Sequence, residues 1–333
     1  AYVWAIAFVL YDLSYYWLHR CHHEIKILWA SHVVHHHGEE FNLSTALRQT
    51  GTDFFFKWIF YSPMLFLGIP PEIFVTVAAL NLIYQFWVHT EHIDRMGILD
   101  YILVTPSNHR IHHAQNKEYI DANYGGVFII WDRIFGTFID ERKDLKPIYG
   151  TSKPLKSWNP FWANFEVWVQ MFKDSYRTEK WSDKIKVWFS RPKWRPADVE
   201  EKFPVTKNDL SAFQKYDPKI NLTSKLYGFG QLAFASSYSM LVFFNFAELA
   251  YFDLFLTGVF VTTTLVFASF LFENNFYGYY LEFARSLATL GLIFLGNLNY
   301  LQDVVLIHSA ICLLISGIVL FNGKPKQASI EAG

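Results

Sequence analysis

The sequence predicts an all-α, polytopic integral membrane protein with a histidine-rich site on its cytosolic side. Of its 333 residues, 52% are hydrophobic and only 18% are charged. Several apolar runs approach the length of a helix that crosses a bilayer. Of the 13 histidines, 12 lie between His19 and His113. This composition excludes a disordered chain, a coiled coil and a disulfide-stapled domain.

The charge balance and the cysteines narrow the possible partners. The formal net charge is -1, so no overall basic excess would attract nucleic acid, and we expect no nucleic-acid partner. Only Cys21 and Cys312 are present, which is too few for a disulfide framework and fits a membrane protein with a reducing side.

Seven apolar runs are expected to form helices that cross or enter the bilayer. The second and third runs are short, Lys57 lies inside the second, and Pro70-Pro71 separates them, because proline cannot continue a helix. This pair is therefore either a partly immersed hairpin or two full spans. The chain begins with Ala1 inside the first run, so we expect residues to be missing before it. The runs are residues 1–18, 54–69, 73–88, 228–247, 253–272, 279–297 and 302–321.

Topology places the histidines on one side of the membrane. A hairpin that enters the membrane after His36 and returns before His89 leaves the histidine groups before and after it on the same side of the membrane. Residues 141–226 contain 18 Lys and Arg against 11 Asp and Glu, and the positive-inside rule assigns such a stretch to the cytoplasm. We expect three parts: residues 1–140 with the catalytic site and the membrane hairpin, residues 141–227 as a basic cytosolic linker with short helices, and residues 228–333 as C-terminal transmembrane helices.

Four histidine-rich groups predict a metal site. Residues three and four positions apart share one face of a helix, so each group presents two or three imidazoles together. Imidazole binds iron, zinc, copper or nickel, and ten imidazoles exceed the needs of one zinc ion. Two metal ions fit the number, although spacing alone does not distinguish iron from zinc. The ten candidates are His19, His23, His32, His35, His36, His89, His92, His109, His112 and His113.

Three histidines fall outside this set. His22 and His37 lie on other helical faces than their neighbours, so we expect them either to support the ligands from behind or to be exposed. His308 is expected to be a hydrogen-bonded polar residue inside a membrane helix.

Two metals beside a bilayer suit one of two chemistries. Hydrolysis needs a Lewis acid and an activated water, which two zinc ions supply with a few mixed ligands. Oxidation of an unactivated C–H bond needs a redox metal and dioxygen. A buried site rich in histidine at the membrane surface would let a lipid chain reach such a metal, so the sequence favours oxidation.

The histidine motifs also carry a resemblance. HRCHH, SHVVHHH and NHRIHH resemble the three histidine boxes of the fatty acid hydroxylase and sterol desaturase superfamily, integral membrane oxygenases with a histidine-bound di-iron centre. EEFNLSTALRQ, WVHTEHI and NYGGVFIIWDRIFGTF further resemble the branch that oxidises alkylglycerol ether lipids. The likeness is dense over residues 11–140. Beyond them it is limited to the order of segments, a polar stretch followed by a set of apolar helices.

The resemblance implies roles for individual residues. Eight histidines match the three boxes, His89 matches an additional histidine between them, and at the next position either His92 or Glu91 contributes, with Glu91 as the catalytic candidate. Four polar residues after the second box form either a pocket for a cofactor or lipid head group or a solvated, capped helix start: Glu39, Glu40, Asn42 and Arg48.

The resemblance also implies a reaction. An alkylglycerol or lyso-ether lipid would be hydroxylated next to its ether oxygen with dioxygen, two irons and tetrahydrobiopterin, giving a fatty aldehyde and a glycerol derivative, at the endoplasmic reticulum if the organism is a eukaryote. One alternative is a sterol or fatty acyl hydroxylase or desaturase that takes electrons from cytochrome b5 or a ferredoxin. Another is a membrane metal-binding or transport protein, which predicts histidines or acids within the spans, where His308 is the chief example.

Overall fold

The computed structural model describes residues 2–296 and 302–323, and every regular element in these ranges is a helix. The all-α prediction is therefore confirmed for the described part of the chain. The helices form two compact units. Unit 1 contains Ala1–Lys156 and Ala163–Lys215, and unit 2 contains Ser157–Trp162 and Tyr216–Gly333.

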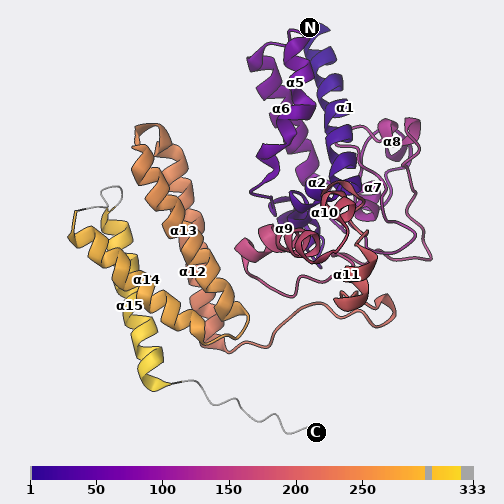
Figure 1. Cartoon of the computed structure of the whole chain (residues 1–333). Coiled ribbons are helices and arrows are strands. Elements are labelled where there is room, and N and C mark those ends of the chain that lie inside the picture. Colours follow the sequence, from indigo (N-terminus) through magenta and orange to yellow (C-terminus); the bar gives the residue numbers. More distant parts are fainter. Residues whose placement is uncertain (1, 297–301, 324–333) are drawn as a thin grey trace. The chain divides into compact units, whose positions relative to one another are not determined.

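Three apolar helices form one end of unit 1. Helices α5 (Lys57–Phe66) and α6 (Pro71–Trp87) both lie along α1 (Tyr2–Glu24), as Figure 1 shows. Their contact buries a small core that includes Ala7 and Met64. These helices correspond to the first three apolar runs of the sequence.

The lengths of α5 and α6 can be compared with what each alternative for this pair requires, a partly immersed hairpin or two full spans. Helix α5 has 10 residues and α6 has 17, which correspond to about 15 Å and about 26 Å at 1.5 Å per residue. A bilayer core is about 30 Å thick, so α5 alone is shorter than the core, and the partly immersed hairpin stays a prediction. The outward surface of the hairpin is apolar, with Trp58, Phe66 and Ile83 all exposed.

A buried carboxylate fixes α1 against the rest of unit 1. Asp12 accepts hydrogen bonds from the Asn81 side chain at 2.8 Å, from the backbone amides of Val127 (2.8 Å) and Phe128 (2.9 Å), and from the Trp131 indole at 2.9 Å. The side chain is fully buried, and a buried carboxylate is tolerated only when it is paired in this way. Asp12 thus joins α1, α6 and the segment that follows the third histidine motif.

Short helices lie at the base of the hairpin, and two of them, α3 and α7, each carry two candidate histidines. Each of these helices is only one or two turns long. Helix α7 begins with Pro106 at its first position, where the missing amide costs no helical hydrogen bond. Their bounds are α2 (Lys26–Ala30), α3 (Val33–His36), α4 (Leu43–Ala46), η1 (Asp53–Phe55), η2 (Gly97–Tyr101), α7 (Pro106–His112) and α8 (Ile130–Ile134).

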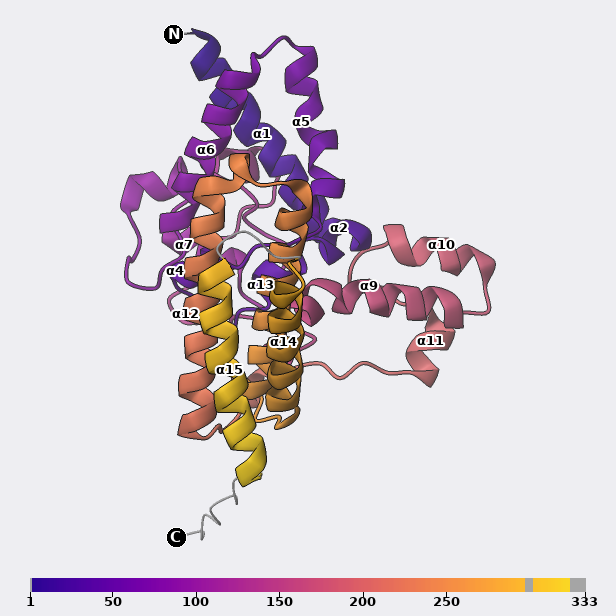
Figure 2. The ribbon, with the colours of Figure 1, turned by 90° about the vertical axis from the view of Figure 1, so that its left-hand side faces the viewer.

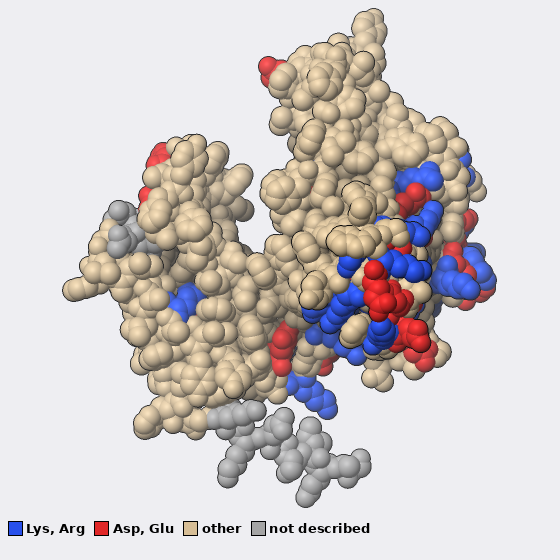
Figure 3. Space-filling view, in the orientation of Figure 1, with Lys and Arg blue, Asp and Glu red and all other residues tan. Residues whose placement is uncertain are grey.

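The segment expected as a linker is more structured than the sequence suggested. Residues 163–215 belong to unit 1, and α9 (Pro160–Arg177) is 18 residues long. The helices α10 (Trp181–Phe189) and α11 (Ala197–Lys202) and the turn η3 (Leu210–Ala212) follow. In Figure 3 the charged groups gather over this polar end of unit 1, while the hairpin surface is almost free of them.

Unit 2 is a bundle of long helices. Helix α12 (Leu222–Asn245), the turn η4 (Phe246–Glu248), and helices α13 (Tyr251–Phe272), α14 (Tyr277–Phe294) and α15 (Gln302–Asn322) run alongside one another (Figure 2). The last four apolar runs thus form helices, except that residue 297 lies outside the described residues. Of all described helices, α13 and α15 are long and apolar enough to cross a membrane.

His308 lies inside this bundle as a hydrogen-bonded residue, as the sequence suggested. Its Nε2 donates to the side-chain oxygen of Gln231 at 3.0 Å, and its ring stacks on Phe234 with centroids 3.5 Å apart.

Candidate metal centre

Nine of the ten candidate histidines converge in two groups within unit 1. The ligand atoms of each group lie within 4.8 Å of one another. Because all of them are imidazole nitrogens with no cysteine among them, each group suits a metal of the first transition row. The five-histidine group contains His19, His23, His32, His36 and His112, and the four-histidine group contains His35, His89, His109 and His113.

The two groups adjoin because α3 and the end of α7 each contribute a histidine to both groups. Consecutive residues of α3 diverge, His35 to the four-histidine group and His36 to the five-histidine group. At the end of α7, His112 and His113 diverge in the same way. The rings of His36 and His113 stack across the boundary with centroids 4.4 Å apart. The arrangement therefore provides two neighbouring metal positions.

Backbone carbonyls orient four of the rings. The Nδ1 of His19 donates to the Tyr124 carbonyl at 2.9 Å, and the Nδ1 of His112 donates to the Ala122 carbonyl at 3.0 Å. In the four-histidine group, the Nδ1 of His89 donates to the Gln85 backbone carbonyl at 2.8 Å, and the Nδ1 of His35 donates to the Arg48 backbone carbonyl at 3.2 Å. A ring nitrogen that faces a carbonyl must carry the proton, so Nε2 keeps its lone pair for a metal.

The inward nitrogens lack other partners. The Nε2 atoms of His19, His23 and His112 are buried without a hydrogen bond. The Nε2 atom of His109 lies 2.9 Å from that of His89 and 3.1 Å from that of His113. Nitrogens bound to one metal at about 2.1 Å would lie about 3.0 to 3.4 Å apart. The residues present therefore fit a bound metal in both groups.

Burial keeps these imidazoles neutral. Desolvation lowers the pKa of His35 to about 3, and it lowers the pKa of His89 and of His112 to about 4. Neighbouring histidines lower the pKa values of His35 and His112 further, because two imidazolium charges would repel each other. The neutral ring is the form that binds a metal.

His92 and Glu91 lie apart from both groups. Helix α6 ends at Trp87, so the three-residue spacing from His89 to His92 no longer places both on one helical face, and His92 is exposed. Glu91 is also exposed, and its carboxylate accepts a hydrogen bond from the Tyr149 hydroxyl at 2.9 Å. The structure thus does not bring His92 into the ligand set, and it places Glu91 at the edge of the site.

The four candidates for a cofactor pocket have other contacts. Glu40 is exposed and pairs with Lys215 at 2.6 Å. Asn42 caps α4 by accepting the Ser44 amide at 2.9 Å, Arg48 donates to the Val34 carbonyl at 2.7 Å, and Glu39 lies beside Gly150. These contacts agree with the alternative of a capped helix start.

His22 and His37 are both buried, but only His22 contacts a candidate ligand. His22 is buried and stacks on His32 with centroids 4.9 Å apart. His37 is buried with its Nε2 3.8 Å from the carboxylate of Glu166. Neither belongs to the two groups, and neither is exposed.

Asp132, which the histidine pattern did not predict, holds the turn that orients one of the candidate ligands. Asp132 accepts hydrogen bonds from the amides of Tyr124 at 2.7 Å and Gly125 at 2.8 Å. It therefore fixes the turn whose carbonyl orients His19. The Asn-Tyr-Gly-Gly sequence at 123–126 was the available signal, because Asn123 has a positive φ of 59° and Gly125 has no room for a side chain.

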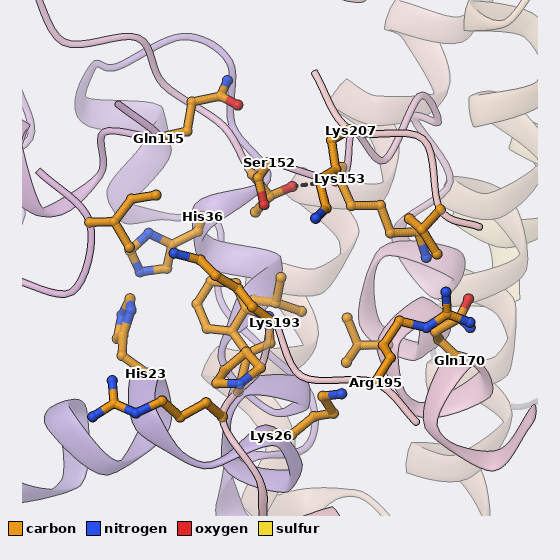
Figure 4. Close-up of a pocket in the computed structure, with 18 of the residues that line it drawn as sticks. His23, Lys26, His36, Gln115, Ser152, Lys153, Gln170, Lys193, Arg195 and Lys207 are labelled. Atoms are coloured by element: carbon orange, nitrogen blue, oxygen red, sulfur yellow. Dashed lines mark hydrogen bonds between the residues drawn. The ribbon is translucent and has the colours of Figure 1, made fainter. Parts of the chain in front are cut away.

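A cavity of about 550 Å³ in unit 1 reaches both groups. His23, His36 and His112 of the five-histidine group and His113 of the four-histidine group form part of its wall. In Figure 4, His23 and His36 lie on one side and Gln170 and Arg195 on the other. Its size falls in the usual range for small-molecule sites. The remaining wall comes from α2, the start of α3, residues 114–121, residues 150–153, α9 and residues 191–207.

Comparison with known proteins places this site in a family. Residues 4–137 match the model of the fatty acid hydroxylase family. The human alkylglycerol monooxygenase is 36% identical over 324 residues, which cover 96% of this chain and 71% of the human protein. The chain belongs to the alkylglycerol monooxygenase family. All nine converging histidines lie within the matched domain.

Other relatives agree with this assignment. The Xenopus tropicalis alkylglycerol monooxygenase is 43% identical over 217 residues, or 65% of this chain and 48% of the frog protein. The chain thus aligns with about half the length of that alkylglycerol monooxygenase. An ornithine lipid hydroxylase of Rhizobium tropici is 32% identical over 142 residues, covering 40% of this chain and 43% of that protein. No solved structure matches the chain at a significant level.

Proposed function

We propose that this chain is a membrane di-iron monooxygenase that hydroxylates the carbon next to the ether oxygen of alkylglycerol lipids. The observation that carries the proposal is the division of nine buried imidazoles into two adjoining groups. The names of the family members point to the same substrate class. Nine neutral nitrogen donors without thiolate suit iron, and an unactivated C–H bond calls for a redox metal.

The two groups would hold one iron each. When bound, the iron pair supplies the activation of dioxygen that no amino-acid side chain provides. The balance of the reaction requires two electrons and two protons, which we assign to tetrahydrobiopterin. One oxygen atom enters the C–H bond, and the other leaves as water. The resulting hemiacetal breaks its C–O bond to give a fatty aldehyde and a free glycerol hydroxyl.

The protein itself supplies position and exclusion of water. Phe41 covers the four-histidine group, with its ring 5.6 Å from His89 and 5.2 Å from His113, and Tyr149 stacks on its outer face at 4.9 Å. The apolar hairpin provides a surface along which an alkyl chain could approach, because its large side chains face outward. A fixed orientation of the reacting carbon accounts for a large share of such rate enhancements.

We propose in addition that the chain is a multi-pass membrane protein with its metal site on the cytosolic side, in the endoplasmic reticulum membrane of a eukaryote. Helices α13 and α15 support the membrane assignment. The excess of Lys and Arg in residues 141–226 supports the orientation.

One experiment tests the function. The full chain is purified in detergent, its metal is measured, and oxygen-dependent aldehyde release from an alkylglycerol is followed with and without tetrahydrobiopterin. We expect about two irons per chain, release only with pterin, and loss of both metal and activity in His112→Ala. One labile zinc per chain without oxygen consumption would contradict the proposal in favour of a metal-binding protein. Turnover of a sterol or fatty acyl lipid with cytochrome b5 would favour the other hydroxylases.

A further inference from the structure

The cavity beside the histidines carries more positive than negative charge. Six Lys and Arg line it against four Asp and Glu. Three of the cations are neutralised inside the pocket. Lys153 pairs with Glu166 at 2.6 Å and Arg195 with Asp174 at 2.8 Å. Arg191 lies 3.9 Å from Asp121.

The other three cations form no salt bridge within the described residues, and Glu200, the fourth acid of the cavity, interacts with Lys26 and Arg195 only at longer range. Within the described residues, Lys193 and Lys207 form neither an ion pair nor a hydrogen bond, and both are exposed at the wall of the cavity. Lys193 interacts with Asp121 at longer range and shares that carboxylate with Arg191. Figure 4 shows Lys193 between the side of the pocket that carries His23 and the side that carries Arg195.

Lys26 adds a third, buried cation. Its ammonium donates to the carbonyl of Trp194 and lies over the Trp194 ring at 6.0 Å. Only 5% of the residue is exposed, and burial lowers the pKa of Lys26 to about 8. Asp174 and Glu200 act on this ammonium at longer range, but Asp174 is already paired with Arg195, so an anion in the pocket would stabilise the charge of Lys26 further.

The inner wall of the same cavity is apolar. Trp29, Val33, Val167 and Met171 line it, and Met171 belongs to a buried apolar cluster. The cavity therefore combines an apolar wall, an excess of two positive charges with three ammonium groups outside salt bridges, and access to both histidine groups. A purely hydrophobic molecule would leave the ammonium groups uncompensated, and a small inorganic anion would leave the apolar wall empty.

We propose that this cavity binds the phosphate group of an anionic ether lipid, with Lys193 and Lys207 as the residues that recognise the phosphate. This inference rests on the proposed function and adds a preference to it: a phosphate-bearing alkylglycerol is a better substrate than the neutral alkylglycerol of the same chain length. Lys26 supports the bound anion from the interior. The apolar wall then faces the glycerol backbone and the first carbons of the alkyl chain.

The experiment compares two substrates that differ by one phosphate, 1-alkylglycerol and 1-alkylglycerol 3-phosphate, in the full-length protein loaded with iron. The variants are Lys193→Ala, Lys207→Ala and their combination, with Lys143→Ala as the matched control. Lys143 is an exposed lysine that does not line the cavity. We expect the double variant to raise the KM for the phosphate-bearing lipid about tenfold, since each charge-assisted contact contributes. The KM for the neutral lipid is expected to change less than about twofold.

A binding measurement separates this inference from the proposed function. Calorimetric titration with a short-chain alkylglycerol phosphate measures affinity without turnover, so it decides the site even if neither lipid is oxidised. Weaker binding in the double variant, reduced further by salt, supports the site. Equal affinity of wild type and double variant overturns it. A rise in the KM for tetrahydrobiopterin, with the lipid KM unchanged, also overturns it, because the cavity would then belong to the reductant.

Discussion

The Nδ1 of His19 donates a hydrogen bond to the backbone carbonyl of Tyr124 at 2.9 Å, across 105 positions of sequence. Asp132 in turn holds the amide of Tyr124 at 2.7 Å. The orientation of a metal-ligating imidazole on α1 therefore depends on a carboxylate that contacts no ligand. The turn of residues 123–126 connects the first histidine motif with the third.

Asp132→Ala is expected to weaken metal binding although Asp132 touches no metal. Without its two backbone contacts, the carbonyl that orients His19 loses its support, and such orienting partners contribute about 10- to 100-fold in metal affinity. Metal retention against a graded chelator measures the change. Asp140→Ala is the control, because Asp140 is exposed and pairs only with Arg95 in this region. If both variants retain the metal equally, the turn of residues 123–126 keeps its conformation without Asp132, and the prediction is wrong.

His89→Ala and His92→Ala are expected to differ sharply. His89 belongs to the four-histidine group, whereas His92 is exposed outside it. The first variant should lose the metal of that group, and the second should keep both metals. Metal content per chain measured after gel filtration decides the matter. Loss of one metal in His92→Ala would restore it to the ligand set and contradict the arrangement found here.

The sequence predicted well which histidines converge, because helical spacing is local. His19 with His23, and His109 with His113, are one turn apart on α1 and at the end of α7. The same rule placed His92 with His89, where the chain has already left α6 at Trp87. Spacing also could not divide neighbours such as His35 and His36 between two groups, since that division depends on contacts of the α3 rings with α1, with the end of α7 and with the residue His89 after α6.

The cavity could not be predicted from the sequence. Its wall joins α2 and α3 to residues 150–153, α9 and residues 191–207. Helices α2 and α3 lie more than 100 positions before the other segments in the sequence, and no local sequence pattern predicts contacts between them. The cofactor prediction for Asn42 and Arg48 rested on the family resemblance. In the structure, Asn42 caps α4 and Arg48 holds α3. These contacts give both residues a positioning role, and the cofactor role stays a prediction.

Arg48→Ala is expected to disturb the four-histidine group. The Arg48 carbonyl accepts from His35 at 3.2 Å, and its guanidinium holds the Val34 carbonyl at 2.7 Å. Loss of the side chain should loosen this loop and lower the metal occupancy of that group several-fold. Gln49→Ala, one residue on and exposed, serves as the control. A changed KM for tetrahydrobiopterin at full metal occupancy would instead assign Arg48 to a cofactor site.

Acid is expected to release the metals only well below pH 6.5. The pKa values of His89 and His112 in the folded, metal-free protein are lowered to about 4 by burial, so protons compete for these nitrogens only as the pH approaches that value. In the unfolded chain the same groups take up protons near pH 6.5. The metal-free protein should therefore lose stability as the pH falls from 6.5 towards 4.

Two measurements check this pH dependence. Metal content after dialysis between pH 7 and pH 4 should stay high down to about pH 5. The midpoint of thermal unfolding of the metal-free protein should fall over the same range. Release of half the metal at pH 6.5 would mean that these imidazoles are hydrated, which contradicts their burial.

Disruption of the pair of Glu282 and Arg285 in unit 2 is expected to be severe for single variants and mild for a double variant. The two side chains lie 2.7 Å apart with 0% and 5% of their surfaces exposed, and the Tyr227 hydroxyl donates to the same carboxylate oxygen at 3.2 Å. Removing one partner leaves an uncompensated buried charge, which costs about 3 to 5 kcal/mol, whereas replacing both by apolar residues of similar volume is often neutral.

Cys312 offers a local measure of this effect, because it is 1% exposed and lies in the same bundle. In a Cys21→Ser background, a thiol-reactive dye reports the temperature at which the bundle opens. Arg285→Met should lower that temperature strongly, and Glu282→Leu combined with Arg285→Met should recover most of it. Glu248→Gln, at an exposed acid of unit 2, is the control. If the double variant opens as early as the single one, the pair stabilises the bundle by more than mutual neutralisation, because the buried ions then specify how the helices pack.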